Sequence, residues 1–174
     1  MTALKVVLIK PSKYGVDGHV ERFVNGFMPN ATLYHIAGLT PDNVNSVAVV
    51  THTIDEYVRD DLEYLEHLRF DRNYITLVAI VGVQSHQFHR ALDLAAYACS
   101  HGIRHCIIGG PHPMTCDTSQ FHNRGVSFSL AEAEVVWNQI LSDAISGELL
   151  PVYGENNRWA KVLDGTIVTP PNTT

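Results

Sequence analysis

The residues of this sequence that could do chemistry lie in four short segments near the ends of apolar runs. These segments are rich in Gly, Ser and His, and they span residues 11–19, 83–87, 109–116 and 127–132. In an open parallel sheet, ligands bind beyond the carboxyl ends of the strands, where such loops converge. At Gly109-Gly110 a ligand could lie against bare backbone, because glycine has no Cβ. The segments therefore predict a ligand-binding edge, although a tight turn explains the glycine pair equally well.

The cysteine and histidine spacings do not predict a metal centre. The three cysteines are separated by seven and ten residues, which matches no zinc-binding pair, and an odd number argues against a disulfide framework. The ten histidines include no HExxH pattern, and the one HxxxH spacing, His101 to His105, lies across the expected end of a helix and start of a strand. No Ser, His and Asp arrangement typical of a nucleophilic enzyme stands out either. We therefore expect a site that binds a ligand rather than one that carries its own acid, base or nucleophile.

The pattern of apolar residues predicts strands and helices in strict alternation. Strand-like runs occupy residues 4–9, 32–36, 47–51, 75–82, 103–108 and 126–130, and helical patterns occupy about 20–27, 55–69, 85–101 and 131–146. Alternation of this kind produces βαβ crossovers and a parallel sheet. The expected fold class is α/β, a doubly wound Rossmann- or flavodoxin-like five-stranded parallel sheet with helices on both faces.

Composition and charge limit the classes of partner. The chain is 45% hydrophobic and 17% charged, and its net charge is −6 without any run of Lys or Arg. Nucleic acid and anionic membranes are therefore not expected partners, because phosphate binding needs clustered positive charge. No apolar stretch of about 18 residues predicts a membrane span, and no charged leader precedes the first strand. We expect a cytoplasmic protein with one domain over residues 1–150 and a proline-rich arm or linker over 151–174.

Three segments near the ends of the later predicted strands stand out as a set. They are Gly109-Gly110-Pro111-His112-Pro113, Val83-Gln84-Ser85-His86-Gln87 and Gly125-Val126-Ser127-Phe128-Ser129-Leu130-Ala131-Glu132-Ala133-Glu134. Together they resemble the cobalamin-binding domain of cobalamin-dependent radical SAM enzymes, over roughly residues 4–150. The GGPHP segment is the most specific part of this resemblance, and the third segment looks like the family's last strand and acidic helix start.

The resemblance implies how cobalamin would bind. In that family the corrin ring lies over the strand ends. The nucleotide tail, with its dimethylbenzimidazole swung away from cobalt (base-off), enters a cleft beside the sheet. By this likeness Ser127 and Ser129 contact the buried base, and helix N-termini favour the single phosphate. The residues implied at the cofactor are Gln84, Ser85, His86, Gln87, Gly109, Gly110, Pro111, His112, Ser127, Ser129 and Ala131.

The loop after the first strand has a separate place in this resemblance. Many cobalamin carriers use Asp-x-His-x-x-Gly, in which His binds cobalt and Asp orients the imidazole ring. Asp17-Gly18-His19 matches the first half, but Arg22 stands where the pattern has Gly. His19 is therefore a candidate cobalt ligand with Asp17 as its partner, and a polar loop histidine is the simpler alternative. Tyr14 is a second candidate for the lower face of the corrin.

The chemistry implied by the resemblance needs more than this chain. Radical SAM enzymes hold an iron–sulfur cluster on CxxxCxxC and cleave S-adenosylmethionine there, and the cysteines of this sequence do not form that pattern. We therefore expect a cofactor-binding part that is not catalytic alone. It would serve methyl transfer or a related reaction carried by a separate or missing radical SAM domain. A free-standing corrinoid carrier and a cobalamin-sensing module are alternatives with the same ligand.

A flavin- or nucleotide-binding protein of flavodoxin type is the alternative with a different ligand. The loop after the first strand lacks both the GxGxxG pattern and the Lys-Ser/Thr of a P-loop. A flavin domain would also usually have a Ser/Thr-rich phosphate loop there, and residues 11–19 contain only Ser12. These absences count against this alternative, and the resemblance makes cobalamin the preferred ligand.

Overall fold

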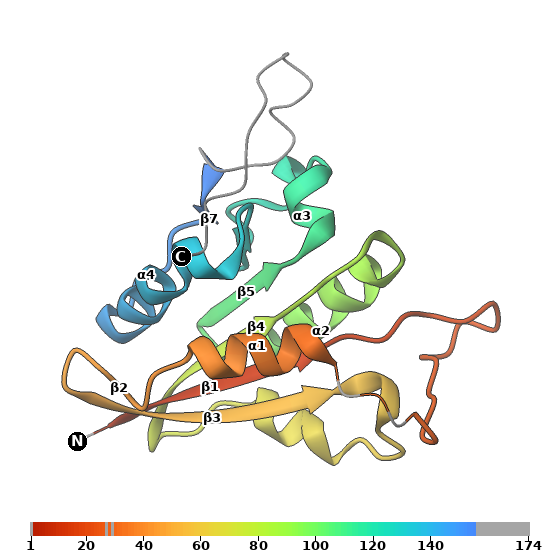
Figure 1. Cartoon of the computed structure of the whole chain (residues 1–174), viewed down its shortest axis with the longest axis horizontal. Coiled ribbons are helices and arrows are strands. Elements are labelled where there is room, and N and C mark those ends of the chain that lie inside the picture. Colours follow the sequence, from red (N-terminus) through yellow and green to blue (C-terminus); the bar gives the residue numbers. More distant parts are fainter. Residues whose placement is uncertain (1, 27, 29, 156–174) are drawn as a thin grey trace.

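Long apolar runs form the centre of the sheet in the computed structural model, which describes residues 2–26, 28 and 30–155 (Figure 1). Strand β1 (Ala3–Lys10) lies between β3 (Val47–Asp55) and β4 (Tyr74–Ile80), and all three strands are parallel. Most residues of β1 and β4 are buried, because helical segments cover both faces of these strands. This burial explains why both strands are apolar almost throughout.

The remaining strands extend the sheet on both sides of this centre. They are β2 (Asn43–Val44), antiparallel to β3, and the parallel strands β5 (His105–Gly109), β6 (Ser127–Ser129) and β7 (Val152–Tyr153). The order β2-β3-β1-β4-β5-β6-β7 confirms the predicted α/β class and contains the flavodoxin-like order of parallel strands. The sheet has seven strands rather than five, and β2 and β7, with two residues each, are too short to produce a periodic signal.

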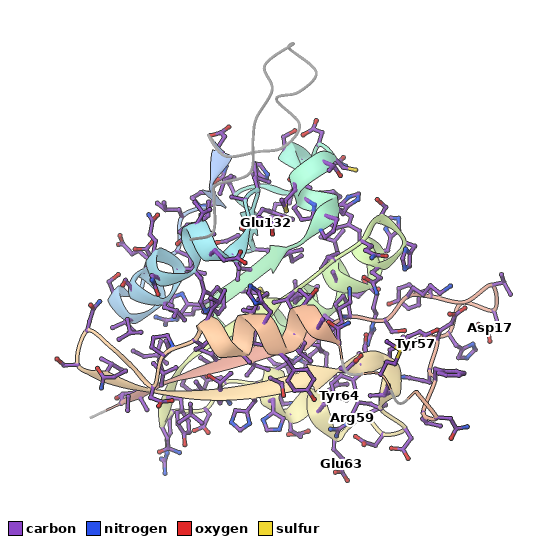
Figure 2. All side chains as sticks on the ribbon, in the orientation of Figure 1. Asp17, Tyr57, Arg59, Glu63, Tyr64 and Glu132 are labelled. Atoms are coloured by element: carbon purple, nitrogen blue, oxygen red, sulfur yellow. The ribbon has the colours of Figure 1, made fainter. Side chains whose placement is uncertain are left out.

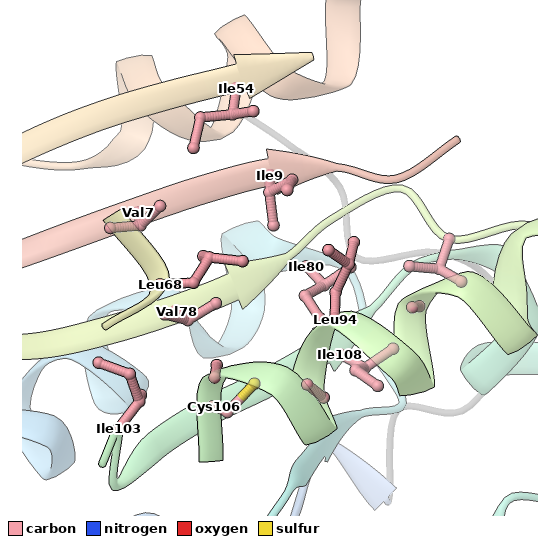
Figure 3. Packing of buried hydrophobic residues seen from close by; sticks show 14 of the residues in the cluster. Val7, Ile9, Ile54, Leu68, Val78, Ile80, Leu94, Ile103, Cys106 and Ile108 are labelled. Atoms are coloured by element: carbon pink, nitrogen blue, oxygen red, sulfur yellow. The ribbon is translucent and has the colours of Figure 1, made fainter. Parts of the chain in front are cut away.

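Helices cover the two faces of the sheet in separate layers (Figure 1). α1 (Ala31–Leu39) and α4 (Ala133–Ser146) pack on one face. α2 (Phe88–Ser100) packs on the other face together with the 3₁₀ helix η2 (Glu63–Leu68), and Figure 3 shows Leu94 of α2 among the buried strand residues there. None of the helices in the described ranges is long and apolar enough to cross a membrane.

The connections after β1 and β4 leave the sheet toward opposite faces. The chain passes from β1 to α1 on one face, whereas it passes from β4 through the 3₁₀ turn η3 (Ser85–Gln87) to α2 on the other. Such a reversal opens a crevice at the carboxyl ends of the two strands, which is where doubly wound proteins bind ligands. The short helix α3 (Pro111–Thr115), directly after β5, lies at the same edge.

The predicted strand at 32–36 is wrong, because these residues belong to α1. The helix begins after Asn30, whose side-chain Oδ1 accepts a hydrogen bond from the backbone N–H of Leu33 at 3.1 Å. Leu33 and Ile36 are three residues apart and both are buried, which places them on one face of the helix. A short apolar stretch is compatible with either element, and here the Asn30 cap and the packing of the helix decide.

Two predicted helices are also wrong. In the described part of 20–27 there is no helix, and Val20 instead forms an isolated antiparallel bridge with Tyr14. Residues 55–69 contain two 3₁₀ helices, η1 (Glu56–Val58) and η2, rather than one α-helix. Asp61 separates them, because its side chain accepts the backbone N–H of Glu63 at 2.8 Å and forms a local turn.

The chain end differs from the predicted boundary as well. The predicted domain ends at residue 150, but β7 pairs with β6 and so belongs to the sheet. Tyr153 of β7 is buried, and its hydroxyl donates to Asp143 of α4 at 2.8 Å. The rest of the predicted arm, from residue 156 onward, lies outside the described residues.

A buried ion pair holds the carboxyl edge of the sheet together. Glu56 has no exposed surface, and its carboxylate accepts hydrogen bonds from Arg90 of α2 at 2.5 and 3.2 Å. The same carboxylate accepts the Tyr64 hydroxyl at 2.6 Å and the backbone N–H of Ser12 at 2.8 Å. Burial by itself would raise the pKa of Glu56, but these donors outweigh burial and lower it, so the group is held as a carboxylate.

Arg22, which stands where the Asp-x-His-x-x-Gly pattern has Gly, belongs to the same cluster. Arg22 donates to the backbone carbonyl of Glu56 at 2.7 Å and to the Tyr64 hydroxyl at 3.0 Å. A glycine there would remove both contacts. The loop after β1 is thus tied at Ser12 and Arg22 to the end of β3 and to η2.

We expect Arg90→Met to lower the free energy of unfolding by about 3–5 kcal/mol, because it leaves the buried Glu56 carboxylate without its charged partner. The measurement is urea unfolding at neutral pH. Arg72→Met, at an exposed position, is the matched control and should leave the midpoint unchanged. Equal stability of the Arg90 variant and wild type would contradict a structural role for the pair.

Candidate ligand-binding site

A cavity of about 700 Å³ lies between α1, α4 and the ends of the central strands. On the side of the sheet its lining includes four small residues, Ala79, Gly109, Ser129 and Ala131, together with Val81 and Ile107. On the side of the helices, larger apolar residues line it: Ile36, Val136, Trp137 and Ile140. The cavity exists because the strand ends offer little side-chain volume at the level where α1 and α4 lie over the sheet. Its size is that of an ordinary small-molecule site.

Polar residues surround the mouth of this first cavity. The lining residues that are exposed include Thr32, Gln84, Thr115 and Glu134, so these mark the open side. Several of them stand at the N-termini of α1 and α4, where unpaired backbone N–H groups favour a negatively charged group.

The acidic side chains of the mouth lie at the start of α4. His35 Nε2 is 2.6 Å from Glu134 Oε1, a pair that joins α1 to α4. A hydrogen bond from its own backbone N–H lowers the pKa of Glu134, and His35 adds to this effect. Glu132, labelled in Figure 2, behaves differently, since burial and the neighbouring Glu134 charge raise its pKa. The two carboxylates of the mouth therefore differ in how easily they lose their charge.

Lys10 stands at the opposite side of the mouth, at the end of β1. Its ammonium donates to the carbonyl oxygen of Gly82 and to Gln87 Oε1, the latter at 2.7 Å. Gln87 is itself held by the backbone, because its Nε2 donates to the Pro11 carbonyl at 2.9 Å. Burial lowers the pKa of Lys10 to about 8, and the Asp55 charge partly opposes this shift. Lys10 was not predicted from the sequence, where its only signal was the position of a charged residue at the end of an apolar run.

A second cavity of about 690 Å³ lies beside the first at the same edge of the sheet. The two cavities share Lys10, Asn30 and Ala31. Aromatic and basic residues contribute to the second one, including Phe23, Tyr57 and Lys13. Lys10 therefore lies between two cavities at the carboxyl ends of β1 and β4.

The structure brings together about half of the residues predicted to contact a ligand. Those lining the first cavity are Gln84, Gly109, Gly110, Pro111, Ser129 and Ala131. Those lining the second are His86 and Gln87. The predicted residues that line neither are Tyr14, Asp17, His19, Ser85, His112 and Ser127. The six predicted residues that line the first cavity are the geometric evidence for a ligand-binding site.

Three of the remaining residues have partners within the protein. His112 Nδ1 is 3.0 Å from Ser85 Oγ, and the His112 ring lies 4.0 Å from the Phe88 ring. Burial lowers the pKa of His112, and its interaction with the nearby His89 contributes. Ser127 is buried on β6 beside Ile107. The two contacts of His112 join α3 to the start of α2, and Ser127 belongs to the buried part of the sheet. Each of the three residues therefore has a structural role that does not depend on a ligand.

The first loop does not bring His19 to either cavity. The loop extends beyond the strand ends at the right of Figure 1, and Figure 2 shows Asp17 near its tip. The His19 side chain is 85% exposed, with its Nδ1 3.5 Å from Asp17 Oδ2. Tyr14 is anchored instead, because its hydroxyl donates to Asp93 and lies 3.3 Å from Arg90 Nη1. His19 as a cobalt ligand stays a prediction.

The packing of two loops explains why glycine occupies positions 109 and 110, whether or not a ligand also lies there. A Cβ on Gly110 would lie 2.1 Å from the backbone nitrogen of Val83, and the residue has a φ of +134°. A Cβ on Gly109 would lie 3.3 Å from the Cβ of Ser129. The loop after β5 therefore packs directly on the loop after β4. The backbone N–H of His112 donates to the Val83 carbonyl at 2.9 Å. Contact of Gly110 with a ligand stays a prediction.

Comparisons with known proteins add no identification, since no family model, curated protein or solved structure matches the chain. Within the described part of the chain, no group of three or more His, Cys, Asp or Glu side chains is arranged to hold a metal ion. A single histidine bound to the cobalt of cobalamin would not form such a group.

We expect Gly110→Ala to lower the free energy of unfolding by about 3 kcal/mol or more, through collision with Val83 and a strained backbone. Gly18→Ala is the matched control, because Gly18 also has a positive φ but nothing lies near its missing Cβ. It should cost only about 1–2 kcal/mol. Thermal unfolding of both variants separates the two effects, and similar losses would contradict the close approach of the loops.

Proposed function

We propose that the chain binds cobalamin base-off, with the nucleotide tail in the first cavity and the corrin ring over the strand ends. The observation that carries the proposal is the position of the cavity. It opens at the carboxyl edge of the parallel sheet and is lined by Gly109, Gly110, Ser129 and Ala131. These residues come from two of the three segments on which the resemblance to cobalamin-binding domains rests.

The lining fits the chemistry of the nucleotide tail. A flat aromatic base suits the apolar inner walls formed by Ile107, Trp137 and Ile140. Ser129 adds a hydroxyl on the strand side, which donates its hydrogen to the Ala131 carbonyl at 3.0 Å and keeps its lone pairs to accept from a ribose hydroxyl of the tail. A ribose and phosphate suit the polar mouth. No cluster of positive charge is required, because cobalamin carries only one phosphate.

The proposal assigns this chain a binding role rather than a catalytic one. When bound, cobalamin supplies a methyl group on cobalt, and the residues around the cavity supply shape, hydrogen bonds and exclusion of water. The reaction itself, methyl transfer or a related radical SAM step, is proposed to be carried by another domain or subunit in the cytoplasm. That partner would hold S-adenosylmethionine and an iron–sulfur cluster. A free-standing carrier or a cobalamin sensor uses the same site.

FMN is the second candidate ligand, favoured by the flavodoxin-like strand order. The loop after β1, where flavodoxin-type proteins bind the FMN phosphate, argues against it. The Ser12 N–H donates to Glu56 at 2.8 Å, and the Ser12 hydroxyl donates to the Glu21 carbonyl at 2.5 Å. With these donors engaged, the loop offers little to a phosphate. Cobalamin therefore remains the first proposal.

We expect wild-type protein to bind hydroxocobalamin with a saturable change in its visible spectrum. Ser129→Phe should weaken this binding at least about tenfold, because the ring would occupy space needed by the tail. Ser100→Phe, an exposed position at the end of α2, is the matched control and should bind as wild type does. Thermal unfolding of each variant checks that the fold is intact. No binding at micromolar wild-type protein would overturn the proposal.

A separate expectation concerns the lower face of cobalt. The spectrum of bound hydroxocobalamin should be the same in His19→Ala and in wild type, because His19 is exposed at a loop tip and lines neither cavity. Visible absorbance distinguishes a histidine-bound from a base-off corrinoid. Loss of a histidine-bound spectrum in the variant would instead make His19 the cobalt ligand.

A further inference from the structure

The position of Lys10 sets it apart from the other charged residues at the edge of the sheet. It ends β1 at the crevice where the connections after β1 and β4 diverge, and it lines both cavities. Lys13, the other lysine at this edge, lines only the second cavity and forms an ion pair with Glu21 at 3.2 Å. Among the residues that the structure describes, Lys10 forms no such ion pair, and Asp55 acts on it only at longer range.

The hydrogen bonds of Lys10 leave it ready for an anion. An ammonium group has three N–H donors, and those of Lys10 that have protein partners point to the Gly82 carbonyl and to Gln87 Oε1. Both partners are neutral, so they fix the group without cancelling its charge. The Gln87 oxygen is held in turn by the Gln84 N–H at 3.1 Å. A donor fixed in this way loses little side-chain entropy when a ligand binds.

The charges around the mouth favour the side of Lys10 for a negative group. Glu132 and Glu134 follow β6, whereas Lys10 ends β1, and three strand spacings separate these strands. The first turn of α1, at Ala31 and Thr32, lines the mouth on the side of Lys10 and adds backbone N–H groups.

We infer that Lys10 binds the phosphate of the ligand in the first cavity and so selects for phosphorylated ligands. The inference rests on the proposed function in that the ligand is expected to be cobalamin, whose tail carries a phosphodiester. FMN presents the same chemistry, a phosphate beyond a flat apolar ring. Lys10 is thus a binding residue for an oxyanion in either case, and the experiment separates the two sources.

The experiment compares wild type, Lys10→Met and Lys13→Met by isothermal titration with two matched pairs of ligands. Hydroxocobalamin has the phosphate, whereas dicyanocobinamide is a corrinoid without the nucleotide tail; FMN and riboflavin differ only in the phosphate. We expect Lys10→Met to weaken hydroxocobalamin binding about 10- to 100-fold, the range for a hydrogen bond to a charged group. Binding of dicyanocobinamide should not change, and Lys13→Met should bind both corrinoids as wild type does.

The outcomes separate this inference from the proposed function. Unchanged hydroxocobalamin affinity in Lys10→Met, or equal loss for both corrinoids, overturns the role of Lys10 and leaves cobalamin binding in place. Failure of wild type to bind hydroxocobalamin overturns the proposed function. In that case, Lys10-dependent binding of FMN but not of riboflavin still supports the inference, and the absence of such binding overturns it.

A second measurement uses the wild-type chain, in case Lys10→Met does not fold. Amine-reactive labelling followed by peptide mass spectrometry is run with and without each phosphorylated ligand. The phosphorylated ligand should protect Lys10 and leave the labelling of Lys13 unchanged, and the unphosphorylated partner should protect neither. Labelling of Lys10 that is equal in the presence of both members of a pair overturns the inference.

Discussion

The buried Glu56 carboxylate is the constraint on which the carboxyl edge of this sheet depends. One charged group accepts hydrogen bonds from Arg90, Tyr64 and Ser12, and thereby connects α2, η2 and the loop after β1. A buried carboxylate is costly unless it is fully compensated, so these three segments are fixed together or not at all. The Ser12 N–H and hydroxyl of the loop after β1 are consequently engaged within the protein, and the first cavity lies at the neighbouring strand ends.

The two faces of the sheet differ in how completely side chains fill the space between strands and helices. Toward α2, the strands present Val78, Ile80 and Ile108, and the space is filled by packed side chains (Figure 3). Toward α1 and α4, the strand ends present small residues such as Ala79 and Ser129, and a cavity of about 700 Å³ results. Small side chains at a strand end thus leave space unfilled, because the helices above them are held in place by the rest of the core.

The candidate site combines a charged mouth with apolar walls. Its charged groups are Lys10 on one side and the Glu132 and Glu134 pair on the other, with apolar walls between them. Backbone packing, rather than space for a ligand, already explains Gly110. Cobalamin is therefore proposed as the source of the reactive atom, and the chain contributes the orientation of the cofactor.

The fold class and the edge that carries the site could be read from the sequence, because they depend on local patterns. The apolar run at 75–82 and the helical period at 131–146 act within a few residues of chain, and a parallel sheet follows from their alternation. The stretch at 32–36 was ambiguous by itself, and packing made it a helix. The pairing of Glu56 with Arg90 and the exposure of Lys10 to two cavities join residues far apart in the chain. Only the tertiary structure decides such contacts, since no local pattern records which distant side chains will meet.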